Sequence, residues 1–236
     1  MPTTLEAILE RRATRGFDPV KVPAAARDQI LTAACAAPSS FNSQPYRLIW
    51  IESPGAKEKA AELCLSQSPA VTASVLVVAV ADLGLWKATN EGQLQWMRET
   101  GFSEDKILGF EKKTKFSKWF YLQGWFNVFG AAKWTVLKTI HPWKIFGMAP
   151  ASRQGLFKWA TKSTALACAN LMIAAEALGF NTCPMEGFDG ARLGKFLGLS
   201  GRTQEIVMVI AVGKKSANHQ DEPRWRRPLE ATVTIL

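Results

Sequence analysis

The chain has 236 residues, of which 47% are hydrophobic, and a formal net charge of +9. This length and composition predict a single packed domain, 1–236, and argue against a disordered chain. The first twelve residues contain acids and no long apolar stretch, so we expect a cytoplasmic protein without a secretory signal. Four widely spaced cysteines and two histidines favour neither a disulfide framework nor a metal site.

The predicted elements follow one another without an internal repeat or a low-complexity linker. Thr3 or Thr4 is the expected N-cap of the first helix, and Gly179 is placed to end the last one. The apolar run at 73–82 is typical of a strand that is buried on both faces. In chain order we predict a helix at 4–12, a helix at 23–36, a loop at 37–45, a strand at 46–52, a strand at 73–82, a helix at 163–179, a strand at 205–213 and a strand at 231–236.

Two of these helices have apolar surfaces that we expect to pack against another part of the protein. Leu5, Ile8 and Leu9 form one face of the first helix. The helix at 163–179 is apolar nearly all round, so we expect it to be buried, in part against another subunit.

The excess charge lies in one part of the chain. Residues 111–162 contain ten Lys or Arg and a single acid, Glu111, whereas the remainder has 19 basic and 19 acidic residues. The same segment holds five of the nine Trp and six of the thirteen Phe. A regional charge of this kind indicates a contact made by that segment.

Four short stretches carry side chains suited to a polar, phosphorylated ligand. Arginines recur at the first and last of them, and guanidinium groups match the geometry of phosphate. Taken alone, the first stretch is more often a solvated charge cluster, and the second resembles many ordinary loops. They are RRATRGF at 11–17, APSSFNSQPYR at 37–47, GFNTCPMEGFD at 179–189 and RWRRP at 224–228.

In this order and spacing, the four stretches resemble the motifs of the FMN-dependent nitroreductase family. The resemblance covers residues 5–82 and 163–236 and no single motif carries it alone. It implies an α+β fold, with a central antiparallel sheet flanked by helices, and a homodimer that holds FMN at the subunit interface. It assigns to the cofactor site Arg11, Arg12, Ala13, Arg15, Pro38, Ser39, Ser40, Asn42, Gln44, Pro184, Met185, Glu186, Gly187, Arg224 and Arg226.

The resemblance also implies roles for these residues. Arg11, Arg224 and Arg226 would hold the FMN phosphate, and Arg15 would lie near the N1 and O2 edge of the flavin and favour its anionic reduced form. The loop at 38–44 would reach the flavin of the opposite subunit. The backbone at 186–187 would approach the flavin N5 edge.

The chain departs from the family pattern in three places. Ala13 replaces the usual Ser of the first motif, and Tyr46 replaces the usual Trp. Where many relatives carry an Asn and a second polar side chain before the strand at 73, this chain has Ser66 and Gln67.

The implied activity is an exchange in two steps, in which NADH or NADPH gives a hydride to the flavin and a nitroaromatic or quinone then takes two electrons. No catalytic side chain and no metal is expected. Other readings stay open: a flavin-sequestering protein, a membrane-docked interaction module, or a reductive dehalogenase-like or flavin-fragmenting enzyme of the same fold.

The stretch at 83–162 is predicted to be an enlarged helical insertion. Between 119 and 132 an amphipathic helix places Trp119, Trp125, Phe126 and Phe129 on one side. These aromatics are interpreted as a substrate-shaping lid, a dimer-clasping arm, or a peripheral contact with the anionic inner face of a membrane. A spanning helix is disfavoured by length and lysines, and nucleic acid has no role in the family.

Overall fold

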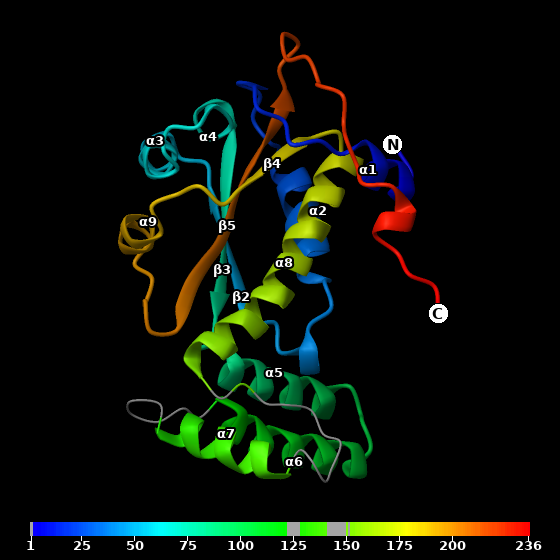
Figure 1. Ribbon diagram of the computed structural model, residues 1–236, viewed down its shortest axis with the longest axis vertical. Coiled ribbons are helices and arrows are strands. Elements are labelled where there is room, and N and C mark those ends of the chain that lie inside the picture. Colours follow the sequence, from blue (N-terminus) through cyan, green and yellow to red (C-terminus); the bar gives the residue numbers. More distant parts are fainter. Residues whose placement is uncertain (1, 122–127, 141–149, 151) are drawn as a thin grey trace.

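The computed structural model describes residues 2–121, 128–140, 150 and 152–236. Figure 1 shows a sheet with helices on both faces and a further group of helices beyond one end of it. The described strands form one five-stranded antiparallel sheet, which confirms the predicted α+β fold. They are β1 (Phe17–Asp18), β2 (Tyr46–Ile51), β3 (Val75–Asp82), β4 (Asn181–Met185) and β5 (Gln204–Lys215).

Side chains cap the first turn of three helices, α1, α8 and α9, among those whose caps the structure describes. Thr3 caps the first one: its hydroxyl accepts from the Glu6 N–H, and the Glu6 carboxylate accepts from the Thr3 N–H. The helices are α1 (Thr4–Glu10), α2 (Ala24–Cys35), α3 (Pro54–Leu63), α4 (Ser68–Thr72), α5 (Trp86–Glu99), α6 (Glu104–Tyr121), α7 (Val128–Ile140), α8 (Arg153–Ala177) and α9 (Gly190–Phe196), with 3-10 turns at Ser40–Asn42 and Leu229–Ala231.

The long helix α8 starts ten residues before the predicted helix at 163–179. Ser152 is its N-cap, and the Ser152 hydroxyl accepts a hydrogen bond of 3.0 Å from the Gly155 N–H. At the other end Gly179 has a φ of +72°, and the Phe180 N–H returns to the Ala175 carbonyl at 2.8 Å. The predicted glycine stop is therefore confirmed.

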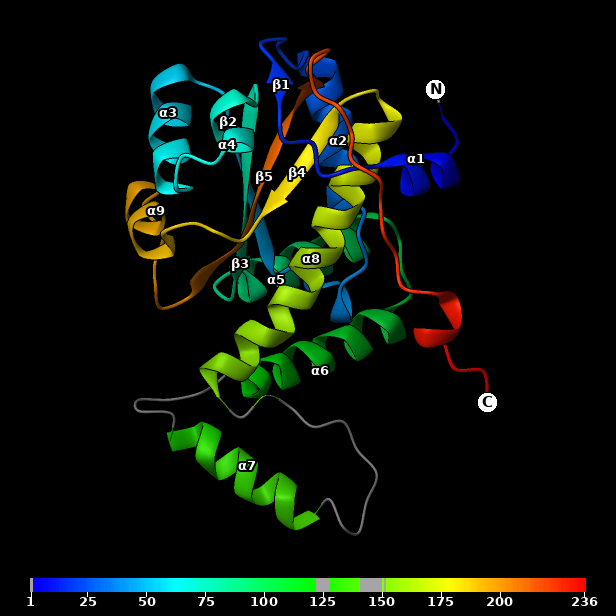
Figure 2. The same ribbon diagram turned by 45° about the horizontal axis from the view of Figure 1, so that its top comes forward.

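Strand β5 is the centre of the sheet. It pairs with β3 along one edge and with β4 and β1 along the other, and β2 lies outside β3. β3 is buried over its whole length, as predicted. Leu76 and Val78 belong to the core beneath α3 and α9, while Val75 and Val77 belong to the core beneath α2 and α8. Figure 2 shows these two helical layers on opposite sides of the strands.

The sequence did not predict one strand of the sheet, and one predicted strand was wrong. Residues 181–185, for which no element was predicted, form β4, because they pair with β5 at residues 209–213. The strand expected at 231–236 is absent from the described chain: the chain passes α1, makes the 3-10 turn and then leads away from the sheet (Figure 1). Because this segment does not pair with the sheet, Val233, Ile235 and Leu236 are exposed.

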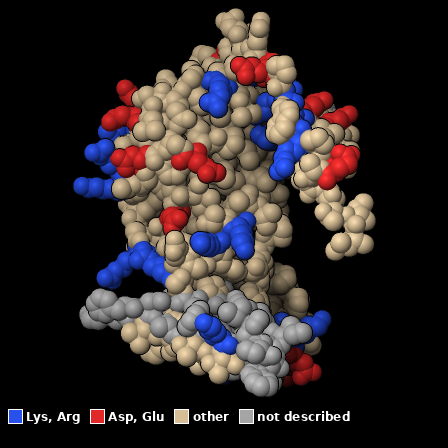
Figure 3. All heavy atoms as spheres, in the orientation of Figure 1, with Lys and Arg blue, Asp and Glu red and all other residues tan. Residues whose placement is uncertain are grey.

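The helices α5, α6 and α7 lie within the predicted insertion, 83–162. An ion pair of 2.9 Å between Arg98 and Glu111 joins α5 to α6, and α7 lies farther from the sheet than α6 (Figure 2). In the lower part of Figure 3, Lys and Arg side chains border this region, while Asp and Glu gather mostly toward the other end. Within the described residues, every helix is too short or too polar to cross a membrane.

Candidate functional site

The first and third motifs lie side by side at one edge of the sheet. Ala13 forms a parallel bridge with Thr182 of β4, and the Thr14 N–H donates to the Thr182 carbonyl at 3.0 Å. The Thr14 and Thr182 hydroxyls are buried and have no hydrogen-bond partner among the described residues. These contacts fix the position of the backbone that carries Arg11, Arg12 and Arg15.

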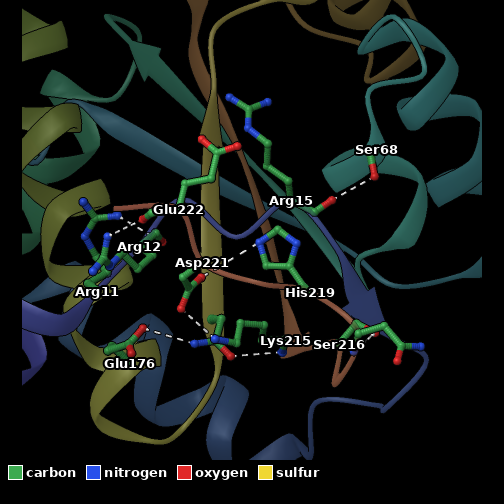
Figure 4. Close-up of polar contacts among 12 residues, drawn as sticks. Arg11, Arg12, Arg15, Ser68, Glu176, Lys215, Ser216, His219, Asp221 and Glu222 are labelled. Atoms are coloured by element: carbon green, nitrogen blue, oxygen red, sulfur yellow. Dashed lines mark hydrogen bonds and ion pairs between the residues drawn. The ribbon is translucent and has the colours of Figure 1, made fainter. Parts of the chain in front are cut away.

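The fourth motif is tied onto the first. Arg224 donates to the Arg11 carbonyl at 3.3 Å and also to the Leu9 carbonyl. Arg12 donates to the Glu222 carbonyl at 3.0 Å, which Figure 4 shows beside Arg11. Two segments more than 200 residues apart in sequence therefore bring their guanidinium groups together.

In this arginine cluster (Arg11, Arg12, Arg224 and Arg226) the positive charges repel one another. Desolvation lowers the pKa of Arg224, and the charges of Arg226, Arg12 and Arg11 lower it further. The ion pairs found in the described part of the chain include none of these four arginines. A dianionic phosphate would relieve this repulsion, so the donor set fits the predicted phosphate site.

Two carboxylates border the arginine cluster. Burial raises the pKa of Glu176, while a hydrogen bond from Asn181 and the charge of Arg11 oppose this rise. A hydrogen bond of 2.7 Å from Lys215 lowers the pKa of Asp221, which also lies 3.9 Å from His219 (Figure 4). These contacts hold the turn after β5, from which the chain continues to Arg224.

Arg15 lies at the same edge but extends away from Arg11 and Arg12 (Figure 4). Its carbonyl accepts a hydrogen bond of 2.8 Å from the Ser68 hydroxyl at the start of α4. Burial raises the pKa of the Cys183 thiol on β4, and the charges of Arg15 and Arg11 oppose that rise. The two arginines therefore act on the same stretch of β4 from different positions.

The backbone after β4 is exposed and held in place. Met185 is buried and Pro184 half-buried, whereas Glu186 and Gly187 are exposed. The Gln67 side chain donates to the Gly187 carbonyl at 2.6 Å and to the Cys64 carbonyl at 3.0 Å. Gln67, which the sequence analysis named only as a departure from the family pattern, thus holds this turn through its side chain.

The second motif lies elsewhere. The loop at 38–44 follows α2 and sits near α5, at the far end of α2 from the arginine cluster (Figure 1). Its side chains bond mainly within the loop: Ser39 Oγ accepts from the Gln44 N–H at 3.0 Å, and Gln44 Nε2 donates to Asn42 Oδ1 at 3.1 Å. Within one chain, Pro38, Ser39, Ser40, Asn42 and Gln44 do not join the arginines.

The helical insertion contacts this loop. Gln93 of α5 donates to the Asn42 carbonyl at 3.0 Å, and the Tyr121 and Ser43 side chains are hydrogen-bonded. Phe129, predicted to face a substrate, is exposed on α7. The predicted positions of Trp125 and Phe126, and of the Trp119 side chain, lie outside the described residues.

The sequence model described as the nitroreductase family matches residues 8–214. The chain belongs to the nitroreductase family. It is 28% identical over 228 residues to the putative NAD(P)H nitroreductase YdgI of Bacillus subtilis, covering 96% of this chain and 94% of that protein. It is 27% identical over 225 residues to protein DrgA of Synechocystis, covering 95% and 88% of the two chains.

Nitroreductases also appear among the similar solved structures. A putative nitroreductase from Exiguobacterium sibiricum, solved in complex with FMN, has a TM-score of 0.75 at 22% identity and covers 99% of this chain and 97% of its own. A putative NAD(P)H:FMN oxidoreductase from Staphylococcus epidermidis has a TM-score of 0.75 at 24% identity, with 100% and 97% covered. These structures confirm the nitroreductase-like fold.

Proposed function

We propose that the protein binds FMN and passes electrons from NADH or NADPH to an electron-poor acceptor, a nitroaromatic or a quinone, in two successive half-reactions. The observation that supports this most directly is the arginine cluster, which is assembled from two distant segments and forms no ion pair within the described residues. The bound flavin would supply the hydride chemistry.

The chain's own residues would bind and orient this cofactor. Arg11, Arg224 and Arg226 would hold the phosphate, with Arg12 completing the charge. Arg15 would place a positive charge near the flavin ring, and Gln67 would keep the backbone at 186–187 open to it. No side chain of this set needs to move a proton, in keeping with a reaction carried by the cofactor.

The experiment is direct. The purified protein should carry a yellow chromophore that bleaches with NADH or NADPH under anaerobic conditions and recovers when a quinone is added. A protein that cannot be loaded with FMN would overturn the cofactor assignment. Loaded flavin that neither nicotinamide reduces would indicate flavin sequestration instead.

We further propose a homodimer in which the loop at 38–44 completes the partner's flavin site. The separation of this loop from the arginine cluster supports it, as do exposed apolar side chains on α1 and α8. They are Leu5 at 65%, Ile8 at 46%, Leu9 at 55% and Leu166 at 46% exposure. A second copy would cover such a surface.

Mixed dimers test this arrangement. An Arg11→Ala/Arg224→Ala chain and an Asn42→Ala/Gln44→Ala chain should each be inactive alone. Refolded together at equal amounts, they should recover about one quarter of the wild-type activity, because random pairing leaves one intact site in about half of the dimers. Absence of any recovery would contradict a shared site.

For α7 we propose contact with an anionic membrane surface. Val128, Phe129 and Val136 are 63%, 53% and 53% exposed, Lys138 is exposed nearby, and α6 adds further exposed lysines. Phe129→Ser/Val136→Ser should reduce co-sedimentation with phosphatidylglycerol vesicles, while Val71→Ser on α4 should not. If the wild-type protein co-sediments equally with neutral and anionic vesicles, the membrane proposal is refuted. If the double variant no longer forms a dimer, this face of α7 contacts the partner subunit instead.

A further inference from the structure

A cavity of about 530 Å³ lies between the loop at 38–44, α5, α6 and the first turns of α8. This volume is within the range of small-molecule sites. The cavity is separate from the arginine cluster within the chain, and its lining includes no member of the four sequence motifs except Phe41 and Ser43.

Three aromatic rings form an ordered wall of the cavity. Trp86 of α5 and Tyr121 of α6 are stacked, with ring centroids 5.3 Å apart and planes within 11°. Trp159 of α8 meets Tyr121 edge-on, at 5.9 Å and 79°. Aromatic faces arranged in this way favour a flat, unsaturated ring over a branched aliphatic ligand.

The Tyr121 hydroxyl is already satisfied. Burial raises the pKa of Tyr121, and its hydrogen bond with the Ser43 side chain opposes that rise. The phenol is therefore neutral at physiological pH, and the ring rather than the hydroxyl is offered to a ligand. The bond also ties the wall of the cavity to the loop that we assign to the flavin site.

Two of the polar groups that line the cavity, Asn90 and Lys112, carry the argument for the ligand's own polar groups. Asn90 Nδ2 is buried and has no hydrogen-bond partner among the described residues, a state that costs about 1–3 kcal/mol when no ligand completes it. Lys112 also lines the cavity, and the ion pairs of the described chain do not include it. The neighbouring acid, Glu111, forms an ion pair of 2.9 Å with Arg98.

We propose that this cavity binds a planar aromatic molecule that carries a negatively charged group. The rings of Trp86, Tyr121 and Trp159 contact its faces and edge, the Asn90 amide donates to an oxygen on the ring, and the Lys112 ammonium pairs with the anionic substituent. Binding of such a molecule is inferred from the cavity alone. Its role as the electron acceptor rests, in addition, on the proposed function.

Binding is measured with a pair of non-reducible probes of equal shape, 2-naphthoate and naphthalene-2-carboxamide, by calorimetry on the FMN-loaded protein without nicotinamide. The naphthoate should bind about tenfold more tightly, as expected for one charged contact. Lys112→Gln should abolish this preference. Lys106→Gln, which removes a lysine of the same helix that does not line the cavity, should keep it.

Asn90→Leu tests the second contact at nearly constant volume. It should weaken both probes about tenfold or less, since both carry an oxygen that accepts a hydrogen bond. Equal binding of the two probes to the wild-type protein, or a preference that survives in Lys112→Gln, would overturn the proposal.

Turnover separates this inference from the proposed function. 1,4-Naphthoquinone-2-sulfonate should have a lower KM than 1,4-naphthoquinone, and Lys112→Gln should remove the difference. Probe binding as described, with flavin that no nicotinamide reduces, would refute the function and retain the cavity. Turnover of both quinones without any effect of Lys112→Gln on KM would refute the cavity and retain the function.

Discussion

The two ends of the molecule hold their functional side chains in different ways. At the edge near α1 and β4, guanidinium groups are fixed by backbone carbonyls of segments from opposite ends of the chain. At the other end, the helical insertion packs aromatic rings against one another and donates a hydrogen bond from Gln93 to the loop at 38–44. The first arrangement suits a cofactor shared by a family, and the second suits a substrate that differs between relatives.

The largest expected effect is at the arginine cluster. Arg11→Ala/Arg224→Ala should lower FMN affinity by 100-fold or more, since each charge-assisted hydrogen bond contributes about 1.5–3 kcal/mol. Quenching of FMN fluorescence during titration of the apoprotein measures it. Riboflavin, which has no phosphate, should bind the variant and the wild type equally, and Arg202→Ala should leave both ligands unaffected.

The two ends should also differ in their contribution to stability. Leu171 of α8 is fully buried, so Leu171→Ala should lower the free energy of unfolding by about 2–5 kcal/mol. Val136 of α7 is 53% exposed, so Val136→Ala should change it by no more than about 0.5 kcal/mol. Urea unfolding compares them, and a cost above 1 kcal/mol at Val136 would show that α7 is packed in solution.

Much of the sheet end could be predicted because local signals and tertiary packing agree there. β3 is a continuous apolar run, and the finished sheet buries both of its faces. Gly179 occupies a left-handed conformation that ends α8. The family motifs marked the arginine cluster, although nothing in the sequence shows that Arg224 lies against the Leu9 and Arg11 carbonyls.

What could not be predicted depends on contacts between distant segments. β4 contains a proline, which is typical of a loop or an edge strand, and it forms because β5 offers a free edge. The apolar alternation at 231–236 indicates a strand, but this segment runs away from the sheet and pairs with none of the described strands. Asn90 belongs to an ordinary polar helix face until α6 and α8 close the cavity around its amide.

An intermediate effect is expected at the turn after β4. Gln67→Leu removes two hydrogen bonds, to the Gly187 and Cys64 carbonyls, and should cost about 1–2 kcal/mol of stability. We expect kcat to fall more than FMN affinity, because the turn is free to shift while the arginine cluster stays in place. Gln95→Leu on α5, the same change at an exposed site, should affect neither quantity.

The smallest effect concerns the acid beside Arg11. Burial raises the folded-state pKa of Glu176, so its carboxylate destabilises the fold above the unfolded value of 4.5. Glu176→Gln should therefore stabilise the protein at pH 7 by a fraction of a kcal/mol, reduced by solvent screening. Urea unfolding at pH 7 and pH 4 should show the gain only at the higher pH; a loss at pH 7 would mean that attraction to Arg11 dominates.

The central position of β5 has a consequence for how the chain is made. β2 and β3 leave the ribosome well before β5, with residues 83–203 still to be synthesised. At roughly 5–20 residues per second, an apolar strand edge stays unpaired for on the order of ten seconds. Yield in the cell therefore depends on what shields the nascent β3 during that interval, and the helical insertion, which is translated within it, sets how long the delay lasts.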